Sequence, residues 1–226
     1  MISLKRLLFA LVILSSIQFY CFASEMKVKL GPPRLSKELD NLLERRYSCR
    51  AFSAKPLKSS DVGSLLWAAC GKKFDAVTAA TRTIPSAGAT YPLELYIVIG
   101  NNCVDDLKAG IYHYLIEEHA LQLVSEGDKR EELSRACLGQ DYVAFAPVSL
   151  VITALTSRTA ARYGERAERY CYMEAGHACQ NTYLAATDLG IGTVEVGAFL
   201  DKRVALLLGL DQDEIPLNVM PIGYAK

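Results

Sequence analysis

The feature that most constrains the fold of this chain is the pattern of one long helix, from about Arg166 to Leu189, which ends before Gly190. Small side chains fill much of it, and they allow another element to pack closely against it. That element is either another part of the same chain or the same helix of a second copy, because both kinds of packing follow the same physics. The small residues are Ala175, Ala178, Cys179, Thr182, Ala185 and Ala186.

Strands and helices are mixed around this helix without the strict alternation of a doubly wound sheet, so an α+β fold is predicted. Further helices are expected at Ser36–Arg46, Ser60–Cys70, Asp128–Leu138 and Asp201–Leu208, the third with the capping-box spacing of Asp128 and Glu131. Strands are expected at Leu95–Ile99, Ile111–Ile116, Leu121–Val124, Val148–Leu155, Gly192–Val196 and Ile215–Ile222.

The first residues have the pattern of a secretory signal, because Lys5 and Arg6 precede an apolar run from Leu7 to Ala23. This divides the chain into a signal peptide (1–23), a linker (24–34) and one domain (35–226). Export to the periplasm or the medium is expected. The alternative is an uncleaved anchor, since about 17 apolar residues lie at the short limit of a membrane span.

Charge and cysteine usage narrow the classes of partner. The 25 basic and 25 acidic residues give a net charge of zero, so neither nucleic acid nor a membrane surface beyond the leader is expected, and a small-molecule partner is favoured. Six cysteines follow the leader without a C-x-x-C pair, so no zinc site or dithiol motif is predicted. Their even number permits disulfides, although Cys70 and Cys179 lie among alanines and are predicted to be buried thiols.

Two segments have side chains suited to a phosphorylated ring compound. Arg46, Tyr47, Ser48 and Arg50 follow the first helix, and guanidinium and hydroxyl groups bind phosphate oxygens strongly. The alternative is that these cations only complement the helix dipole. The loop Pro85–Ala89 has small side chains that let backbone approach a flat ring, although an ordinary turn has the same composition. No G-x-G-x-x-G pattern supports a Rossmann site.

The long helix also has a polar row, Glu174, His177 and Asn181, at spacings of three and four. A di-metal carboxylate site needs two such Glu-x-x-His motifs, and the chain has one. We therefore expect these side chains to be enclosed in a packed interface and to hydrogen-bond one another.

The order of these motifs resembles the nitroreductase superfamily, over roughly Leu35 to Gly223. The resemblance consists of Arg46-x-Ser48-x-Arg50-x-Phe52, then Pro-Ser-Ala-Gly-Ala before a strand, then a Gly-His-x-x-Gln-Asn helix, and then Gly-x-Gly-x-Val-x-x-Gly-Ala-Phe. The wording of the second and third motifs is similar to SagB-type dehydrogenases.

This resemblance implies a nitroreductase-like α+β fold, with a central, mostly antiparallel sheet flanked by helices, and a homodimer that binds FMN at the subunit interface. Arg46, Ser48 and Arg50 would hold the FMN phosphate and ribityl chain, with Tyr47 between them. The isoalloxazine ring would lie along Pro85, Ser86, Ala87, Gly88 and Ala89, and the backbone of Gly197 and Ala198 would lie near its N5 edge. The last two residues depart from the glutamate-glycine pair of many bacterial nitroreductases, which leaves the substrate face open.

The implied activity is ping-pong transfer of hydride or electrons from a reduced donor, NAD(P)H, to a small organic acceptor of the nitroaromatic or quinone type. No catalytic side chain is assigned, because the flavin carries the chemistry. One alternative is a SagB-type azoline dehydrogenase that oxidises a modified peptide. Another is a flavin-binding electron relay without turnover of its own.

Overall fold

A computed structural model describes residues 27–75 and 79–226, and its contacts divide the chain into Met1–Ser36 and Lys37–Lys226. In the first part, residues 27–36 are exposed and form no helix or strand. The predicted signal peptide lies outside the described residues. Within the described ranges, none of the helices combines the length and the apolar character that crossing a bilayer requires.

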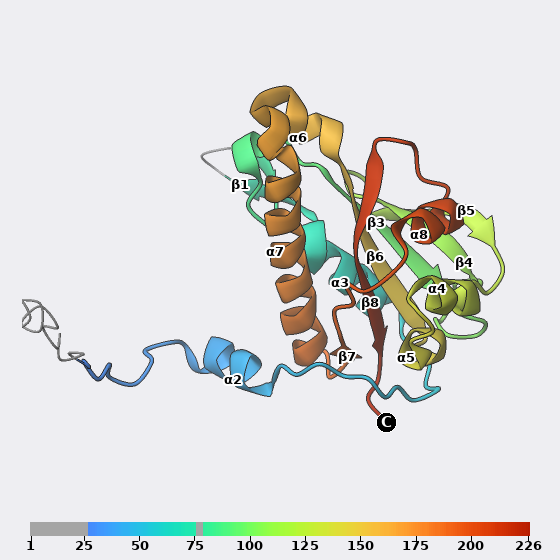
Figure 1. The fold of residues 1–226 in the computed structure, drawn as a ribbon. Coiled ribbons are helices and arrows are strands. Elements are labelled where there is room, and N and C mark those ends of the chain that lie inside the picture. Colours follow the sequence, from blue (N-terminus) through green and yellow to red (C-terminus); the bar gives the residue numbers. More distant parts are fainter. Residues whose placement is uncertain (1–26, 76–78) are drawn as a thin grey trace, which may run out of the picture. The chain divides into compact units, whose positions relative to one another are not determined.

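The domain that begins at Lys37 contains a six-stranded sheet in the order β5-β4-β3-β6-β8-β7, and every neighbouring pair is antiparallel (Figure 1). A separate hairpin pairs β1 with β2. The predicted α+β class with a mostly antiparallel sheet is confirmed. The strands are β1 (Lys72–Asp75), β2 (Ala79–Arg82), β3 (Leu93–Ile99), β4 (Gly110–Leu115), β5 (Ala120–Glu126), β6 (Val148–Leu155), β7 (Gly192–Thr193) and β8 (Glu214–Gly223). The helices are α2 (Lys37–Arg45), α3 (Ser59–Cys70), α4 (Arg130–Ala136), α5 (Asp141–Phe145), α6 (Thr156–Tyr163), α7 (Ala167–Asp188) and α8 (Asp201–Leu208), with short 3₁₀ turns at Ala87–Ala89 and Gly164–Arg166.

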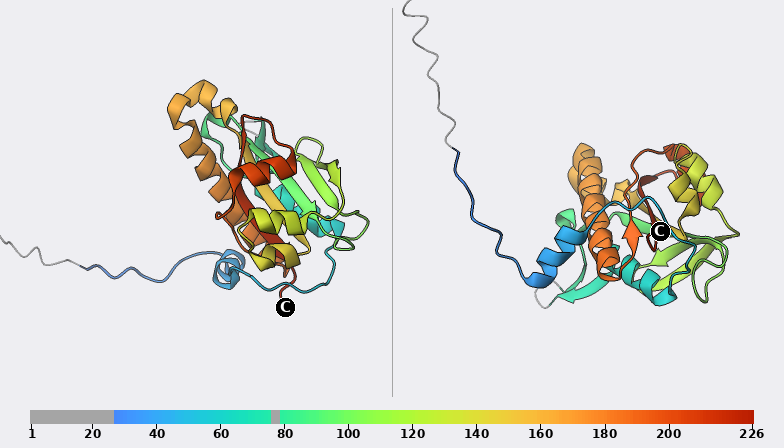
Figure 2. Two further views of the ribbon diagram at one scale, coloured as in Figure 1. Left: turned by 45° about the vertical axis from the view of Figure 1, so that its right-hand side comes forward. Right: turned by 90° about the horizontal axis from the view of Figure 1, so that it is seen from below.

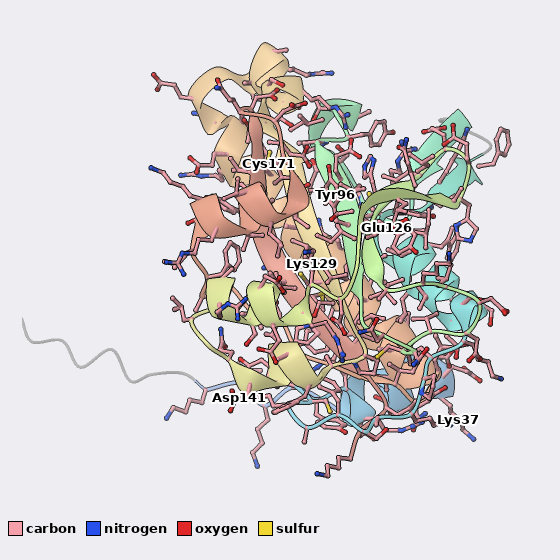
Figure 3. The ribbon with its side chains drawn as sticks, turned by 90° about the vertical axis from the view of Figure 1, so that its right-hand side faces the viewer. Lys37, Tyr96, Glu126, Lys129, Asp141 and Cys171 are labelled. Carbon is pink, nitrogen blue, oxygen red and sulfur yellow. The ribbon has the colours of Figure 1, made fainter. Side chains whose placement is uncertain are left out.

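Helices cover both faces of the sheet, so the central strands are apolar on both sides. Leu95 and Ile97 of β3 belong to the core beneath α3 and α7, whereas Tyr96 and Val98 belong to the core beneath α4 and α8. Figure 2 shows α7 and the pair of α4 and α8 on opposite sides of the sheet. Figure 3 shows the side chains from the side of the sheet that α4 and α8 cover, with Tyr96 labelled on β3 and Asp141 labelled where α5 begins.

The small residues of α7 face the interior of the same chain. Ala175, Ala178 and Ala186 are buried in the core that α7 shares with α3 and the sheet. The opposite face of α7 exposes Tyr172 and Met173, with Gly176 and His177 one turn further on. The small side chains therefore explain packing within the subunit, and any contact with a second copy has to involve the exposed face.

Some elements differ from the sequence-based expectations. The structure adds β1, β2, α5 and α6, and reduces the strand expected at Gly192–Val196 to two residues followed by a single bridge from Val196 to Val219. These additions are short, or, like α6, mostly polar, so they have no apolar periodicity to reveal them. All six described cysteines are free thiols. Burial raises the pKa of Cys70 to about 12, and raises that of Cys179 as well.

The capping box expected at the start of α4 forms only in part. Asp128 Oδ1 accepts a hydrogen bond from the Arg130 backbone N–H at 3.2 Å, but Lys129 occupies the N-cap position, and no bond joins Glu131 to Asp128 among the described residues. The Asp128 carboxylate also accepts hydrogen bonds from the Arg130 guanidinium and from the backbone N–H of Asn101. Asp128 therefore connects the start of α4 to the turn after β3.

This connection predicts an acid-sensitive contribution to stability. Burial raises the pKa of Asp128, but the hydrogen bonds from Arg130 and Asn101 outweigh it and lower the pKa to about 2. An unfolded aspartate titrates near 3.9, so the contribution is complete above about pH 4 and is lost as the pH falls toward about 2. Asp128→Asn should lower the free energy of unfolding by about 1–2 kcal/mol at pH 7 in denaturant titrations. The difference from wild type should shrink at low pH, and an equal difference at pH 7 and pH 2 would contradict this assignment.

Candidate functional site

The segment Arg46–Arg50 is fixed to the chain beside β7. Ser48 forms a parallel bridge with Thr193, and the Cys49 N–H donates to Thr193 O at 2.9 Å. The approach is so close that a Cβ on Gly192 would lie 2.7 Å from Cys49 Sγ. Glycine is therefore required at position 192, and the first and last sequence motifs form one unit.

Tyr183 of α7 connects these two motifs through its side chain. Its hydroxyl lies 3.1 Å from Ser48 Oγ and accepts a hydrogen bond from the Glu195 N–H at 2.8 Å. The Arg46 guanidinium lies 5.2 Å from the centroid of the Tyr183 ring, within the range of a cation–π contact. The helical spacing of Tyr183 from Cys179 and Ala186 marks it as buried, but only the fold reveals these partners.

A small cavity of about 270 Å³ adjoins Tyr183 and Tyr47. Arg46, Ser48 and Arg50 are not among the residues that line it; Arg46 is half-buried and Arg50 is exposed. Among the residues that the structure describes, no ion pair with a carboxylate is recorded for Arg46 or Arg50. Their guanidinium groups are therefore available for an anion. The other lining residues are Arg45, Thr187, Gly190, Ile191, Gly192, Thr193 and Ala225.

The loop Pro85–Ala89 lies beside the N-terminal half of α7, where Glu174 holds it. The Glu174 side chain is 3% exposed, and its Oε1 accepts hydrogen bonds from Ser86 Oγ at 3.0 Å and from the Ala87 N–H at 2.9 Å. Ser86 Oγ also accepts from the Tyr91 N–H at 2.9 Å. Burial raises the pKa of Glu174, and the two hydrogen bonds only partly offset this.

The backbone of this loop is left-handed at Gly88, Ala89 and Tyr91, with φ values of 58°, 54° and 46°. Such values are uncommon for residues other than glycine and cost free energy that surrounding contacts have to supply. At Gly88 a Cβ would lie 2.6 Å from the Tyr163 hydroxyl and 2.8 Å from the Arg162 side chain. Gly88 is therefore favoured by its left-handed conformation, and a Cβ would in addition have to displace the Tyr163 and Arg162 side chains.

Helix α6 holds the other side of the loop. Arg162 donates to Gly88 O at 3.1 Å, Arg158 donates to Tyr91 O at 3.0 Å, and the Thr159 and Thr90 hydroxyls lie 2.9 Å apart. The sequence did not predict this helix or its role. Its arginines at positions 158 and 162, one turn apart, are the only signal that sequence provides.

Arg158 also pairs with Glu94 at 2.6 Å, and His113 lies 2.8 Å from the same carboxylate. Burial raises the pKa of Glu94, but the hydrogen bonds from His113 and Arg158 outweigh it, so the pKa lies below the usual carboxyl value. A charged Glu94 thus fixes α6 to the sheet, and α6 in turn fixes the loop.

The expectation that Glu174, His177 and Asn181 hydrogen-bond one another is wrong. Glu174 binds the loop, Asn181 Nδ2 donates to Ala68 O of α3 at 3.0 Å, and His177 is exposed. The three residues lie on one side of α7, but the loop and α3 present backbone groups to Glu174 and Asn181, which bond to these instead of to each other. The polar row therefore connects α7 to two other elements.

Gly197 and Ala198 form an exposed segment after the bridge between Val196 and Val219. No atom lies within 4 Å of where a Cβ on Gly197 would be, so the backbone is open on that side. Ala198 O accepts a hydrogen bond from Gln140 Nε2 at 3.0 Å.

The structure thus gathers the predicted residues into two groups along α7. Arg46, Ser48 and the segment after Thr193 meet at Tyr183, whereas Pro85–Ala89 meets Glu174. Tyr183 follows Glu174 by nine positions in the helix, so the two residues are roughly 14 Å apart along the helix axis. The arrangement offers cationic and hydroxyl groups at one end and an open, strained backbone at the other.

A larger cavity, of about 950 Å³, lies elsewhere, between α3, the β4–β5 turn and the C-terminal end of α7. Its lining includes Trp67, His119 and Leu189 and none of the predicted site residues. Cavity size alone therefore does not identify the functional site.

Comparison with known proteins agrees with this geometry. A model of the nitroreductase family matches residues 43–224. A protein of Methanocaldococcus jannaschii named as a nitroreductase is 40% identical over 186 residues, which cover 82% of this chain and 90% of that protein. The microcin B17-processing protein McbC of Escherichia coli is 30% identical over 147 residues, 63% of this chain and 54% of that protein. The crystal structure of a protein from Ralstonia eutropha described as a nitroreductase superposes with a TM-score of 0.72 at 29% identity, and the match covers 88% of this chain and 89% of that chain.

Proposed function

Because the chain belongs to the nitroreductase family of oxidoreductases, we propose that it uses FMN to transfer hydride or electrons from NAD(P)H to a small organic acceptor of the nitroaromatic or quinone type. The observation that carries the proposal is the placement of two unlike groups along α7. The Arg46 guanidinium and the Ser48 hydroxyl lie near Tyr183, and an open, left-handed backbone lies at Glu174. A phosphorylated ring compound needs both.

The residues present fit the phosphate and ribityl parts of FMN. Arg46, Ser48 and Arg50 would hold them, because charge-assisted hydrogen bonds to phosphate are about twice as strong as neutral ones. Tyr183 fixes the orientation of Ser48 and stacks against Arg46. Tyr47 is exposed beside the same cavity and would cover the ribityl chain.

The residues also fit the flat ring. Pro85–Ala89 presents small side chains and a backbone that Glu174 and α6 hold in place. No atom lies within 4 Å of where a Cβ on Gly197 would be, so a ring could approach the backbone there closely. The backbone N–H groups of this segment would then reach the edge of the ring. When bound, FMN supplies the hydride chemistry, and the protein supplies orientation and electrostatics.

We propose in addition a homodimer with FMN at the subunit interface, which the exposed face of α7 supports. The exposed face of α7 has two large apolar side chains, Tyr172 at 53% and Met173 at 55% exposure, next to Gly176. An apolar surface of this kind is typical of an interface. If two α7 helices pair in opposite directions, the loop beside Glu174 of one copy lies next to Tyr183 of the other, and this completes each site.

The first test is whether the purified protein binds FMN. We expect a yellow protein that releases FMN on heating and binds riboflavin more weakly, because riboflavin lacks the phosphate. Arg50→Ala should weaken FMN binding at least roughly tenfold, which corresponds to about 1.4 kcal/mol, without changing riboflavin binding. A colourless protein that takes up no added FMN would falsify the proposed cofactor, and equal affinities for the two flavins would refute the phosphate role.

A second candidate function is dehydrogenation of an azoline in a modified peptide. The 30% identity to McbC, a microcin-processing protein, favours it. The two readings differ in the substrate that reduces the flavin: reduction of a quinone or nitroaromatic by NAD(P)H supports the first, and loss of two hydrogen atoms from an azoline peptide to the flavin supports the second. A protein that binds FMN but turns over neither substrate would be an electron relay.

We also propose that the protein is exported, by its predicted leader, to the periplasm or the medium, with a membrane anchor as the alternative. Reduced nicotinamides are scarce in those compartments, so the physiological donor deserves a direct search. Anaerobic titration of the bound flavin with candidate donors is the appropriate measurement. Mass determination of the mature N-terminus distinguishes cleavage after Ala23 from an intact anchor.

A further inference from the structure

The turn between α4 and α5 lies beside the exposed segment Gly197–Ala198. Leu138 and Gly139 are both left-handed, with φ values of 59° and 74°. Two such residues in succession end α4 and reverse the chain, so that Gln140 reaches Ala198. Gln140 Nε2 donates to Cys137 O at 2.8 Å and to Ala198 O at 3.0 Å.

The Gln140 amide has a single orientation that satisfies all of its bonds. Its nitrogen meets two carbonyl oxygens, and its Oε1 accepts from the Tyr142 hydroxyl. The reverse orientation would place an oxygen against two carbonyls. The backbone of the turn is held separately, because Ser134 Oγ donates to Gln140 O at 3.0 Å. Gln140 is therefore a rigid group attached to a buried helix end.

The segment that Gln140 contacts is otherwise held at its two ends and by the Phe199 side chain, which packs against the core beneath α4 and α8. Val196 exchanges two backbone hydrogen bonds with Val219, and the Leu200 N–H donates to Ala136 O at 2.8 Å. Within the described part of the chain, the bond from Gln140 is the only one recorded to residues 197–199. Glycine at 197 adds conformational freedom to the two residues before Phe199, and the bond from Gln140 to Ala198 O restrains them.

We infer that Gln140 is a positioning residue, which fixes the backbone of Gly197 and Ala198 where the edge of a bound flavin ring would lie. The inference rests on the proposed function. Backbone groups aimed at a cofactor are effective only when they are held in advance, since disorder costs free energy each time the site forms. Gln140 supplies this order from outside the site, through one hydrogen bond.

The test compares Gln140→Glu with Ser134→Ala in the full-length protein. Gln140→Glu keeps the size of the side chain and still accepts from Tyr142, but its ionised carboxylate has no donor and faces two carbonyls. Ser134→Ala removes a hydrogen bond from the same turn without touching Ala198. Gln140→Met, which also lacks donors, replaces the glutamate variant if that protein does not fold.

Two readouts are needed: amide hydrogen exchange at Leu200 without flavin, and the midpoint potential of bound FMN. We expect Gln140→Glu to exchange Leu200 about tenfold faster than wild type and to shift the midpoint potential, with Ser134→Ala changing neither. Equal Leu200 exchange in the two variants overturns the inference, and so does an unchanged potential despite faster exchange. A wild type that binds no FMN refutes the proposed function instead, so the two failures are distinguishable.

Discussion

Glu174→Ala is expected to weaken FMN binding about a hundredfold and to lower the free energy of unfolding by about 2–3 kcal/mol. The substitution removes the acceptor for Ser86 Oγ and for the Ala87 N–H, which Glu174 Oε1 holds at 3.0 and 2.9 Å. Two hydrogen bonds to a charged acceptor contribute about 3 kcal/mol together, which is about a hundredfold in affinity if the loop has to be ordered again for binding. Flavin titration by fluorescence and chemical denaturation measure the two effects.

Glu174→Gln is the matched control, because an amide oxygen accepts both hydrogen bonds in the same place. Burial raises the pKa of Glu174, so ionising the carboxyl costs more in the folded chain than in the unfolded one. That cost is absent below the unfolded pKa, near 4.3, and is present above it. The glutamine variant should therefore be at least as stable as wild type at pH 7 and should bind FMN normally. An alanine variant with wild-type FMN affinity would show that the loop needs no such support.

The sequence predicted those strands and helices whose buried residues recur with a regular spacing within the segment itself. Val148–Leu155 is a strand with both faces covered, so its continuous apolar run identified it residue for residue. Helix Asp201–Leu208 also agrees at both ends, with Gly209 left-handed at its C-cap. In contrast, α6 buries only Thr159, so nothing in its sequence separates it from a polar loop.

The contacts of the candidate site could not be read from the sequence, because their partners are far apart along the chain. Glu174 binds residues 86 and 87, and Asn181 binds Ala68, whereas helical spacing alone predicted hydrogen bonds within one polar row. Asp128 similarly bonds to Asn101, far away in the sequence, as well as to Arg130 at the start of its own helix. Polar side chains bind whichever donor or acceptor the tertiary fold presents, and periodicity does not encode that choice. The assignment of the site residues to FMN itself stays a prediction that the binding experiments decide.

Gly176→Arg is expected to separate the proposed dimer into folded monomers and to reduce FMN affinity at least about a hundredfold. Gly176 is exposed on α7, and no atom lies within 4 Å of where its Cβ would be, so the isolated subunit has room for the arginine. In a symmetric dimer the substitution would place a charge on both copies of one interface, and burying unpaired charges costs several kcal/mol. Size-exclusion chromatography and FMN titration should therefore change together.

Two further variants make that result specific. Ala178→Arg lies two residues on but is fully buried against the sheet, so it should unfold the subunit instead of separating a dimer. Leu206→Arg alters a side chain on α8 that is 83% exposed, and it should change neither assembly nor flavin binding. Circular dichroism separates unfolding from dissociation. A Gly176→Arg protein that elutes like wild type and keeps its FMN would place the interface, and with it the second half of each flavin site, on a surface other than α7.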